Sequence, residues 1–386
     1  MNRTRTGSSS LRVAIDARPL SHPQAGGYRS YVRGLVRGLA ERATAGSDAT
    51  PGVIPLLLVD RPITPEWRAS LPPDATVRVL SPDRLRADFV LLPRALRDLG
   101  ADLVHGTQNY LPPGVDAPST VTIHDAFGIR RWPWDTHVAR TPRERFIHAY
   151  WKSMTRLSAR RARKVVTISQ ASADDLAAYL PLPRERITVV YNCSSALPPP
   201  EPPPARSHDT VLAIASPDPR KNLTALYRAV SILAATVCPV NLAVVCASES
   251  LAARTEAELR THGIGRCRLV VAPDDRALAC EYASAACLAF PSWREGFGAP
   301  PLEAMSSGCP VAASDAPALP EVLGDAALYF SPYHPDACAD AIRPIITVPG
   351  LRDALGAAGR AQAARYSPRR MAEETARLWG ETLAAG

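Results

Sequence analysis

Short runs of Val, Ile and Leu alternate with longer amphipathic stretches along this chain. The runs are continuously apolar, which is typical of strands that are buried on both faces of a sheet. They cover residues 11–17, 53–60, 102–106, 120–125, 164–169 and 187–192, and then 210–216, 241–247, 268–272, 287–291, 310–314 and 327–330. The stretches between them, such as 26–43, have helical periodicity. Strand and helix in turn predict an α/β protein with parallel, doubly wound sheets.

A proline-rich segment interrupts this pattern near residue 200. Six prolines lie at 198–200 and 202–204, and they rule out regular structure there. A chain of 386 residues also exceeds the size that one hydrophobic core supports. We therefore predict a disordered N-terminus at 1–10, a Rossmann-like domain at 11–196, a linker at 197–208 and a second Rossmann-like domain at 209–370, with residues 371–386 as a closing segment.

Composition narrows the class of protein. The chain is 46% hydrophobic and 21% charged, and it has no apolar run long enough for a membrane span or a signal peptide. These features predict a cytoplasmic protein. The eight cysteines are scattered without CxxC spacing, which favours buried free thiols over disulfides or zinc ligands.

Positive charge is concentrated between Arg130 and Lys164. This stretch holds eleven Lys or Arg residues against only Asp135 and Glu144. One interpretation is a solvated helical face, and another is attraction for a phosphorylated ligand, an acidic acceptor or the inner face of an anionic membrane. Trp132 and Trp134 leave open a stacking platform for a neutral sugar or cyclitol. No nucleic-acid-binding motif is present.

Polar and glycine-rich residues follow several predicted strands. Ligands bind beyond the carboxyl ends of strands in open parallel sheets, so these residues are candidate site residues. They are Gly26 and Gly27 at the start of a helix, His105, His124 with Asp125, Ser169, and the loop 217–222.

The loop after the strand at 287–291 carries the most specific pattern, "REGFGAPPLEAMSSG". Pro300 or Pro301 suits the first position of a helix, and Gly308 suits its end. We expect Glu303 in that first turn, where it would either complement the helix dipole or accept the hydroxyls of a ribose. A glycine-rich turn of this kind binds phosphate through backbone amides. Glu295 would then face what lies beyond the phosphates.

These residues resemble retaining glycosyltransferases of family 4, which have the GT-B fold. The resemblance rests on "EGFGAPPLE", which separates two glutamates by seven residues, and on "AGGYRSYVRGL", "VTIHDAF", "VVTISQASADDL", "ITVVYN" and "PDPRKNL" in the family's order. It implies two Rossmann-like domains that face a central cleft. The closing segment resembles the terminal helix that crosses back to the first domain in this fold.

The resemblance also implies roles for individual residues. Lys221 and Arg220 would neutralise a nucleotide diphosphate, Glu303 would hold the ribose, and Glu295 would hold the sugar ring. His124 would reach the transferring sugar. The remaining donor-binding residues implied are Gly26, Gly27, Ser216, Gly296, Phe297 and Gly298. Ser216 departs from the family pattern, because many relatives have a phosphate-binding arginine at this position. Either Arg220 supplies the missing charge, or the Ser216 hydroxyl binds the phosphate instead.

The implied function is retaining transfer of a hexose-type sugar from a nucleoside-diphosphate sugar to an acceptor hydroxyl, with no metal and no cofactor. No Asp-X-Asp run and no histidine pair at zinc spacing suggests a metal site. The acceptor would be a small molecule, a lipid-linked intermediate or a glycan, in bacterial polysaccharide or natural-product biosynthesis. A glycosidase, a nucleotide-sugar epimerase of the same fold and a non-catalytic nucleotide-sugar-binding protein are the alternatives.

Overall fold

The structure, a computed structural model, describes residues 10–22, 26–45, 51–112, 114–130, 132, 141–194, 197–236 and 240–385. The chain forms two compact units. Residues 1–193 together with 366–386 make unit 1, and residues 194–365 make unit 2. The N-terminal segment predicted to be disordered lies outside the described residues, apart from Ser10.

Unit 1 is built on a seven-stranded parallel sheet with the order β3-β2-β1-β4-β5-β6-β7. Its strands are β1 (Leu11–Asp16), β2 (Val53–Val59), β3 (Thr76–Val79), β4 (Leu103–Gly106), β5 (Ser119–Thr122), β6 (Lys164–Thr167) and β7 (Ile187–Val189). The register pairs Val13 of β1 with Leu103 of β4. Apart from β3, each strand begins within a residue of the start of a predicted apolar run and ends up to three residues before that run does. Strand β3 was not predicted, because it lies at the sheet edge and is largely exposed.

The helices and turns of unit 1 are α1 (Arg18–Ser21), α2 (Gly26–Ala45), α3 (Pro65–Ala69), α4 (Arg84–Arg86), the π-helical η1 (Ala87–Leu91), α5 (Leu92–Leu99), α6 (Pro142–Arg161), α7 (Gln170–Tyr179), the 3₁₀ turn η3 (Arg184–Arg186) and α15 (Pro368–Ala384). Several of these helices begin at residues with clear capping chemistry. Thr141 and Glu144 form a capping box at the start of α6. Ser169 caps α7 by accepting from the backbone N–H of Ser172.

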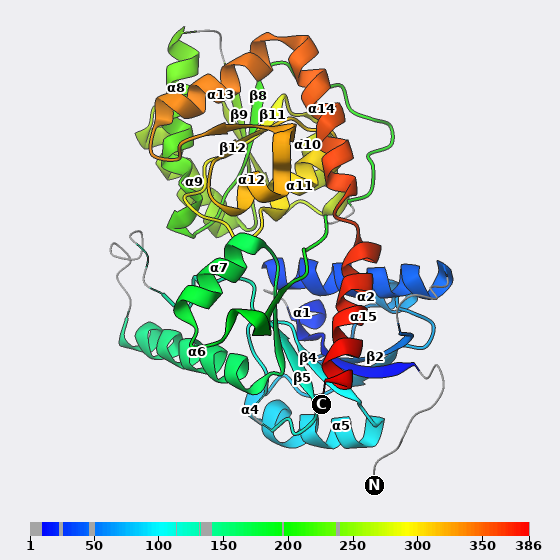
Figure 1. Ribbon diagram of the computed structural model, residues 1–386. Helices are drawn as coiled ribbons and strands as arrows, with labels where there is room; N and C mark the ends of the chain where they lie inside the picture. The colour runs from blue at the N-terminus through cyan, green and yellow to red at the C-terminus, as the bar shows by residue number, and fades with distance from the viewer. Residues whose placement is uncertain are drawn as a thin grey trace. The chain divides into compact units, whose positions relative to one another are not determined.

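The terminal helix α15 lies against α2 in unit 1, as Figure 1 shows. Two glycines of α2 allow neighbouring segments of unit 1 to approach this helix closely. A Cβ at Gly38 would lie 1.9 Å from the carbonyl oxygen of Pro368, and a Cβ at Gly34 would lie 2.2 Å from Cys193 Sγ. The side of α15 that includes Trp379 and Met371 is buried.

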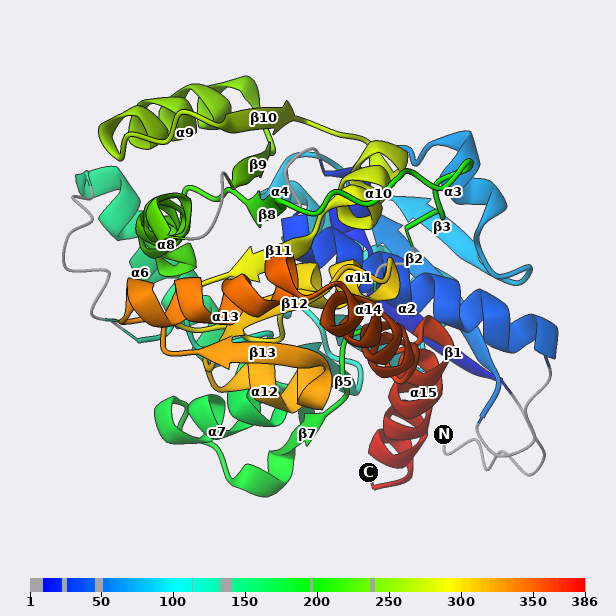
Figure 2. The ribbon, with the colours of Figure 1, turned by 90° about the horizontal axis from the view of Figure 1, so that it is seen from above.

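Unit 2 is built on a six-stranded parallel sheet with the order β10-β9-β8-β11-β12-β13, which can be followed down Figure 2. Its strands are β8 (Thr210–Ile214), β9 (Asn241–Cys246), β10 (Cys267–Val271), β11 (Cys287–Phe290), β12 (Val311–Ser314) and β13 (Ala327–Phe330). Residues 197–209, which include the predicted linker, contain neither helix nor strand. Every apolar run predicted in the second half of the chain matches one of these strands.

Helices cover both faces of the sheet of unit 2, with α8 and α13 on one face and α11 and α14 on the other (Figure 2). The helices and turns are η4 (Pro219–Lys221), α8 (Leu223–Thr236), α9 (Glu249–Thr261), α10 (Asp275–Ser284), α11 (Ala299–Ser306), α12 (Ala318–Leu323), η5 (Gly324–Ala326), α13 (Pro335–Thr347) and α14 (Pro349–Ala364). The core between β8, β9, α8 and α13 includes Val211, Leu226, Val244 and Ile342.

The two parallel sheets with covering helices confirm the predicted α/β class. Seven of the cysteines lie in the described residues and are free thiols, and five of these are buried. Among the described helices, none combines the length and the apolar character that crossing a bilayer demands.

Candidate functional site

The loops that follow β8 and β11 meet at one edge of the sheet of unit 2. These two strands are neighbours, and the strand order reverses direction between them, so their carboxyl ends form a topological switch point. The backbone N–H of Trp293 donates to the carbonyl of Arg220 at 2.9 Å and joins the two loops. Arg220, Lys221 and Glu295, all predicted from the sequence, lie on these loops.

The loop after β8 is held in shape by Asp218 and Asn222. Asp218 caps the short turn η4 and accepts from the backbone N–H of Arg220 at 2.9 Å. Asn222 adopts a left-handed conformation with φ of 52°. Its buried amide donates to the carbonyls of Pro291 at 3.1 Å and Pro332 at 2.8 Å. This asparagine therefore connects three strand-end loops, although sequence reasoning gave it no role.

The carboxylate of Glu295 is bound by both predicted cations. Lys221 Nζ lies 2.8 Å from Oε1, and Arg220 Nη1 lies 2.9 Å from Oε2. Burial alone would raise the pKa of Glu295, but the charges of Lys221 and Arg220 outweigh it and lower this pKa to about 2. Burial lowers the pKa of Lys221, and Glu295 opposes that effect. The site therefore holds an ionised glutamate between two cations.

Glu303 lies apart from this cluster on α11. The helix begins at Ala299, so Glu303 is its fifth residue, and the expectation that it lies in the first turn is wrong. The two prolines that were expected to open the helix are its second and third residues. Dipole complementarity, which acts mainly within the first turn, is accordingly a weak explanation for Glu303. Its half-buried carboxylate accepts from Tyr282 Oη at 3.3 Å.

The glycine-rich turn before α11 is sterically constrained. Gly298 has a φ of +96°, and a Cβ there would lie 2.5 Å from Leu319 Cδ2. Phe297 is 3% exposed, so its side chain is part of the core, and only its backbone remains for the predicted donor contact. Gly296 is also buried. Gly308 follows the end of α11 with a φ of +71°, as predicted for a helix-ending glycine.

A cavity of about 450 Å³ opens beside the loop after β8. Its lining includes Ser216, Lys221, Trp293 and Tyr333. Ser216 Oγ accepts from the backbone N–H of Asp218 at 3.2 Å, so this hydroxyl helps to shape the loop. Among the described residues, the lining of this cavity includes neither Glu295 nor Glu303.

The predicted residues of unit 1 are a packed histidine and two exposed glycines. His124 lies between Tyr28 and Tyr31, with ring centroids 4.9 and 4.8 Å away, and its Nε2 is 2.9 Å from the Thr107 carbonyl. Burial lowers its pKa to about 4, so the ring is neutral near pH 7. Gly26 and Gly27 open α2, and no atom lies within 4 Å of a Cβ built on either.

Two other candidates that the sequence suggested in unit 1 are core residues. His105 is fully buried, with Nδ1 2.8 Å from Thr120 Oγ1 and Nε2 3.2 Å from Thr122 Oγ1. Trp132 is 5% exposed, which contradicts its interpretation as a stacking platform. Trp134 lies outside the described residues.

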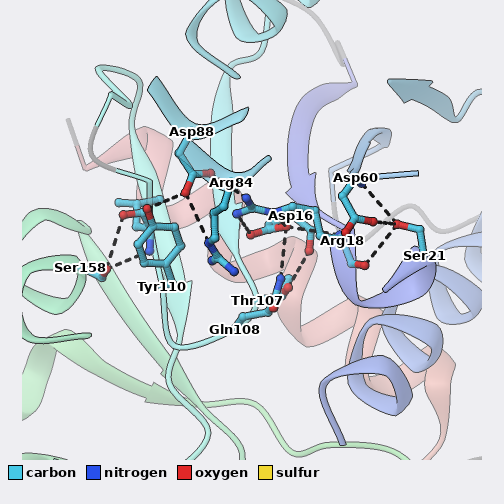
Figure 3. Close-up of polar contacts among 11 residues, drawn as sticks. Asp16, Arg18, Ser21, Asp60, Arg84, Asp88, Thr107, Gln108, Tyr110 and Ser158 are labelled. Atoms are coloured by element: carbon cyan, nitrogen blue, oxygen red, sulfur yellow. Dashed lines mark hydrogen bonds and ion pairs between the residues drawn. The ribbon is translucent and has the colours of Figure 1, made fainter. Parts of the chain in front are cut away.

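Sequence reasoning missed a buried ion network at the switch point of unit 1, between β1 and β4 (Figure 3). Arg18 binds Asp16 through Nε–Oδ1 at 2.8 Å and Nη2–Oδ2 at 2.6 Å. Its Nη1 binds Asp88 Oδ1 at 2.6 Å. Tyr110 Oη donates to Asp88 Oδ2 at 2.7 Å, and Thr107 Oγ1 donates to the Asp16 carbonyl at 2.6 Å.

Charge is balanced within this network. Burial opposes ionisation of Asp16, but Arg18 lowers its pKa below the usual value, and the two aspartates raise the pKa of Arg18. Arg84 adds a second guanidinium, with Nε 3.5 Å from Asp88 Oδ2. Removing one partner of a buried ion pair typically costs about 3–5 kcal/mol. The only signal in the sequence was a strand-end aspartate followed two residues later by arginine.

Comparison with known proteins identifies the family. Residues 25–194 match the model described as Glycosyltransferase Family 4, and residues 201–362 match the model described as Glycosyl transferases group 1. The chain is 32% identical over 286 residues to O-antigen chain mannosyltransferase B of Escherichia coli, covering 71% of this chain and 72% of that protein. It is 28% identical over 239 residues to O-antigen chain mannosyltransferase RfbU of Salmonella typhimurium, covering 60% and 61%.

Solved structures agree on the fold. Sucrose-phosphate synthase from Thermosynechococcus elongatus has a TM-score of 0.74 at 20% identity, covering 97% of this chain and 100% of that chain. WaaG, a glycosyltransferase involved in lipopolysaccharide biosynthesis, has a TM-score of 0.63 at 16% identity, covering 95% and 99%. This chain belongs to glycosyltransferase family 4 and has the GT-B fold.

Proposed function

We propose that the protein transfers a hexose-type sugar, a mannosyl group in the first instance, from a nucleoside-diphosphate sugar to an acceptor hydroxyl of a bacterial glycan intermediate. The observation that carries this proposal is the contact of Lys221 and Arg220 with Glu295 at the switch point of unit 2. The choice of a mannosyl group follows from the names of the relatives in Escherichia coli and Salmonella typhimurium.

The two cations would act on the leaving group. Departure of a nucleoside diphosphate develops negative charge on phosphate oxygens, and preorganised cations stabilise such charge in the transition state. Lys221 and Arg220 can supply that stabilisation themselves, and for this reason we propose a reaction that needs no metal. Ser216 lies on the same loop and would offer a hydroxyl where many relatives offer an arginine.

The two glutamates would divide the rest of the donor between them. We assign the ribose to Glu303 and the sugar ring to Glu295, and His124 of unit 1 to the transferring sugar. A neutral imidazole can exchange hydrogen bonds with sugar hydroxyls without adding charge. Attack of the acceptor hydroxyl from the face that the diphosphate leaves would retain the anomeric configuration.

A panel of nucleotide-sugars tests the proposal. A donor that binds only the folded state at one hundred times its Kd should stabilise the protein by about 2.7 kcal/mol. We expect stabilisation by one nucleotide series in the presence of chelator, slow hydrolysis of the matching donor, and a product with the donor's anomeric configuration by NMR. Loss of binding with chelator would contradict metal independence.

The same panel separates the alternatives. An epimerase would change the sugar of the donor without an acceptor, and a non-catalytic binding protein would be stabilised without any turnover. A glycosidase would hydrolyse glycosides that carry no nucleotide, and it would have no use for Lys221 and Arg220 at a phosphate site.

A further inference from the structure

Unit 1 exposes large apolar side chains on two neighbouring segments. Leu85 is 67% exposed and Phe89 is 57% exposed on α4 and η1, and Phe146 is 73% exposed on α6. We define the apolar face of unit 1 as Leu85, Phe89, Val90, Phe146, Ile147 and Tyr150, each at least 40% exposed. Single exposed apolar residues are ordinary, but a group of this size marks an interaction surface.

Direct contacts join the two segments. The guanidinium of Arg84 lies 4.7 Å from the ring centroid of Trp151 on α6 and 4.7 Å from that of Tyr110. Arg84 and Asp88 are one helical turn apart and face inward toward Tyr110. Leu85 and Phe89 each follow one of these residues, so they form an adjacent, outward stripe. Figure 1 shows α4 next to α6.

The helix that carries half of this face is strongly basic. Helix α6 contains Arg143, Arg145, Lys152, Arg156, Arg160 and Arg161 against a single acidic residue, Glu144. The Glu144 carboxylate is occupied in the capping box with Thr141. Arg143 and Arg145 are exposed and lie within three residues of Phe146. Exposed apolar side chains beside excess cations are the combination that binds anionic lipid interfaces.

We propose that the apolar face of unit 1 docks on an anionic lipid surface, with the exposed rings inserted at the headgroup boundary and the exposed cations Arg143 and Arg145 of α6 on lipid phosphates. Charge complementarity selects this occupant over a second copy of the chain. A two-fold dimer through this face would bring identical cationic helices together, and like charges repel. The surface and its partner go beyond the proposed function, since docking requires neither donor nor transfer.

Sedimentation of the intact protein with vesicles tests the proposal. We expect binding to vesicles of phosphatidylcholine with about 30% phosphatidylglycerol, little binding to phosphatidylcholine alone, and release in about 0.5 M NaCl because salt screens the charges. Phe89→Ser with Phe146→Ser should weaken binding to the anionic vesicles by about tenfold or more. Arg143→Glu with Arg145→Glu should weaken it by at least about 25-fold.

Two control variants make similar changes in apolar surface and in net charge outside the apolar face of unit 1. Val79→Ser removes another exposed apolar residue of unit 1, which is 44% exposed on the edge strand β3. Arg260→Glu with Arg343→Glu makes the same change in net charge on unit 2. Neither control should change vesicle binding by more than about twofold.

Three results would overturn the proposal: no binding to anionic vesicles, equal binding to neutral and anionic vesicles, or equal loss in test and control variants. Absence of vesicle binding together with a dimer that the Phe89/Phe146 variant dissociates would assign the face to a second copy. Nucleotide-induced stabilisation is measured in the same variants and should be unchanged. Its absence in every variant and in the wild type would count against the proposed function and not against docking.

Discussion

Glu295 and Glu303 are eight residues apart in sequence, but their surroundings differ in charge. Glu295 is 8% exposed and is held between Lys221 and Arg220, whereas half-buried Glu303 accepts from Tyr282. Glu295 holds the two cations in place beside the proposed sugar site. Glu303 instead contacts Tyr282 on α10.

This difference predicts separate effects of the two substitutions. Glu303→Ala should weaken binding of the nucleoside diphosphate by about tenfold, because a charge-assisted hydrogen bond to the ribose is lost. Glu295→Gln should leave that Kd within about threefold and lower kcat by about a hundredfold or more, since the glutamine keeps the shape but not the charge near the sugar. Calorimetry and initial rates measure both, and equal losses of nucleotide affinity would contradict the division of roles.

The two buried histidines of unit 1 predict a loss of stability in mild acid. Burial lowers the pKa of His124 to about 4 and that of His105 to about 3, from 6.5 in the unfolded chain. Between pH 6.5 and 4 the unfolded state therefore binds two protons that the folded state does not. As the pH is lowered through this range, the two histidines should reduce the free energy of unfolding by about 2.7 kcal/mol for each pH unit.

A histidine variant isolates this effect. We expect His105→Gln to remove about half of the pH slope, because only His124 then remains neutral in the folded state. Urea denaturation at several pH values, with amide exchange in the strands of unit 1 as the readout, gives the pH dependence of the free energy of unfolding for each protein. The difference between variant and wild type cancels the carboxylates that both share, so a difference independent of pH would contradict the assignment.

Among the elements, α15 depends on its close approach to α2. A Cβ at Gly38 would lie 1.9 Å from the Pro368 carbonyl oxygen and 2.9 Å from Ala372 Cβ, so Gly38→Ala must displace one helix. We expect a loss of about 2 kcal/mol or more, measured by chemical denaturation, with earlier proteolysis of α15. Gly350→Ala is the control, since a Cβ there meets no atom within 4 Å and alanine favours the helix.

Most of the strands that sequence reasoning identified are buried on both faces, whereas the edge strand β10 was identified from its apolar run although its residues are exposed or half-buried. Strands such as β8 and β12 are short apolar runs because both faces of the sheet are covered. Strand β3 is largely exposed and has no such run. The start of α11 was predicted one or two residues too late, at Pro300 or Pro301, because Gly298 in a left-handed conformation already sets the helix to begin at Ala299.

The residues of the candidate site were also predicted only in part, and local sequence pattern again decided which ones. Lys221, Arg220 and Glu295 were predicted because they lie in contiguous motifs of a known family. The ion network of unit 1 joins Arg18 to Asp88 across 70 residues, and no local pattern records a contact made only by folding. Asn222 was inside a predicted motif, yet its bonds to Pro291 and Pro332 depend on the order of strands in the sheet.

At the scale of the whole molecule, the residues predicted to bind phosphate and ribose through side chains all belong to unit 2. A nucleoside diphosphate without sugar should therefore protect amides in the loops 216–222 and 291–298 by about tenfold or more in hydrogen exchange. Strands β1, β4 and β5 of unit 1 should change little. Amide protection that is larger in unit 1 than in these loops would contradict the placement of the nucleotide on the loops after β8 and β11.

The division of the chain at Cys193 and Tyr366 also has a consequence for biosynthesis. Unit 2 is an insertion within unit 1, because α15 of unit 1 is made by the ribosome after all of unit 2. Domains generally fold as units during synthesis, starting from the N-terminus. Here the order is reversed: unit 2 can finish folding while the nascent unit 1 still lacks α15 and leaves the surface of α2 around Gly38 uncovered, so unit 1 is the part that chaperones would hold until α15 emerges.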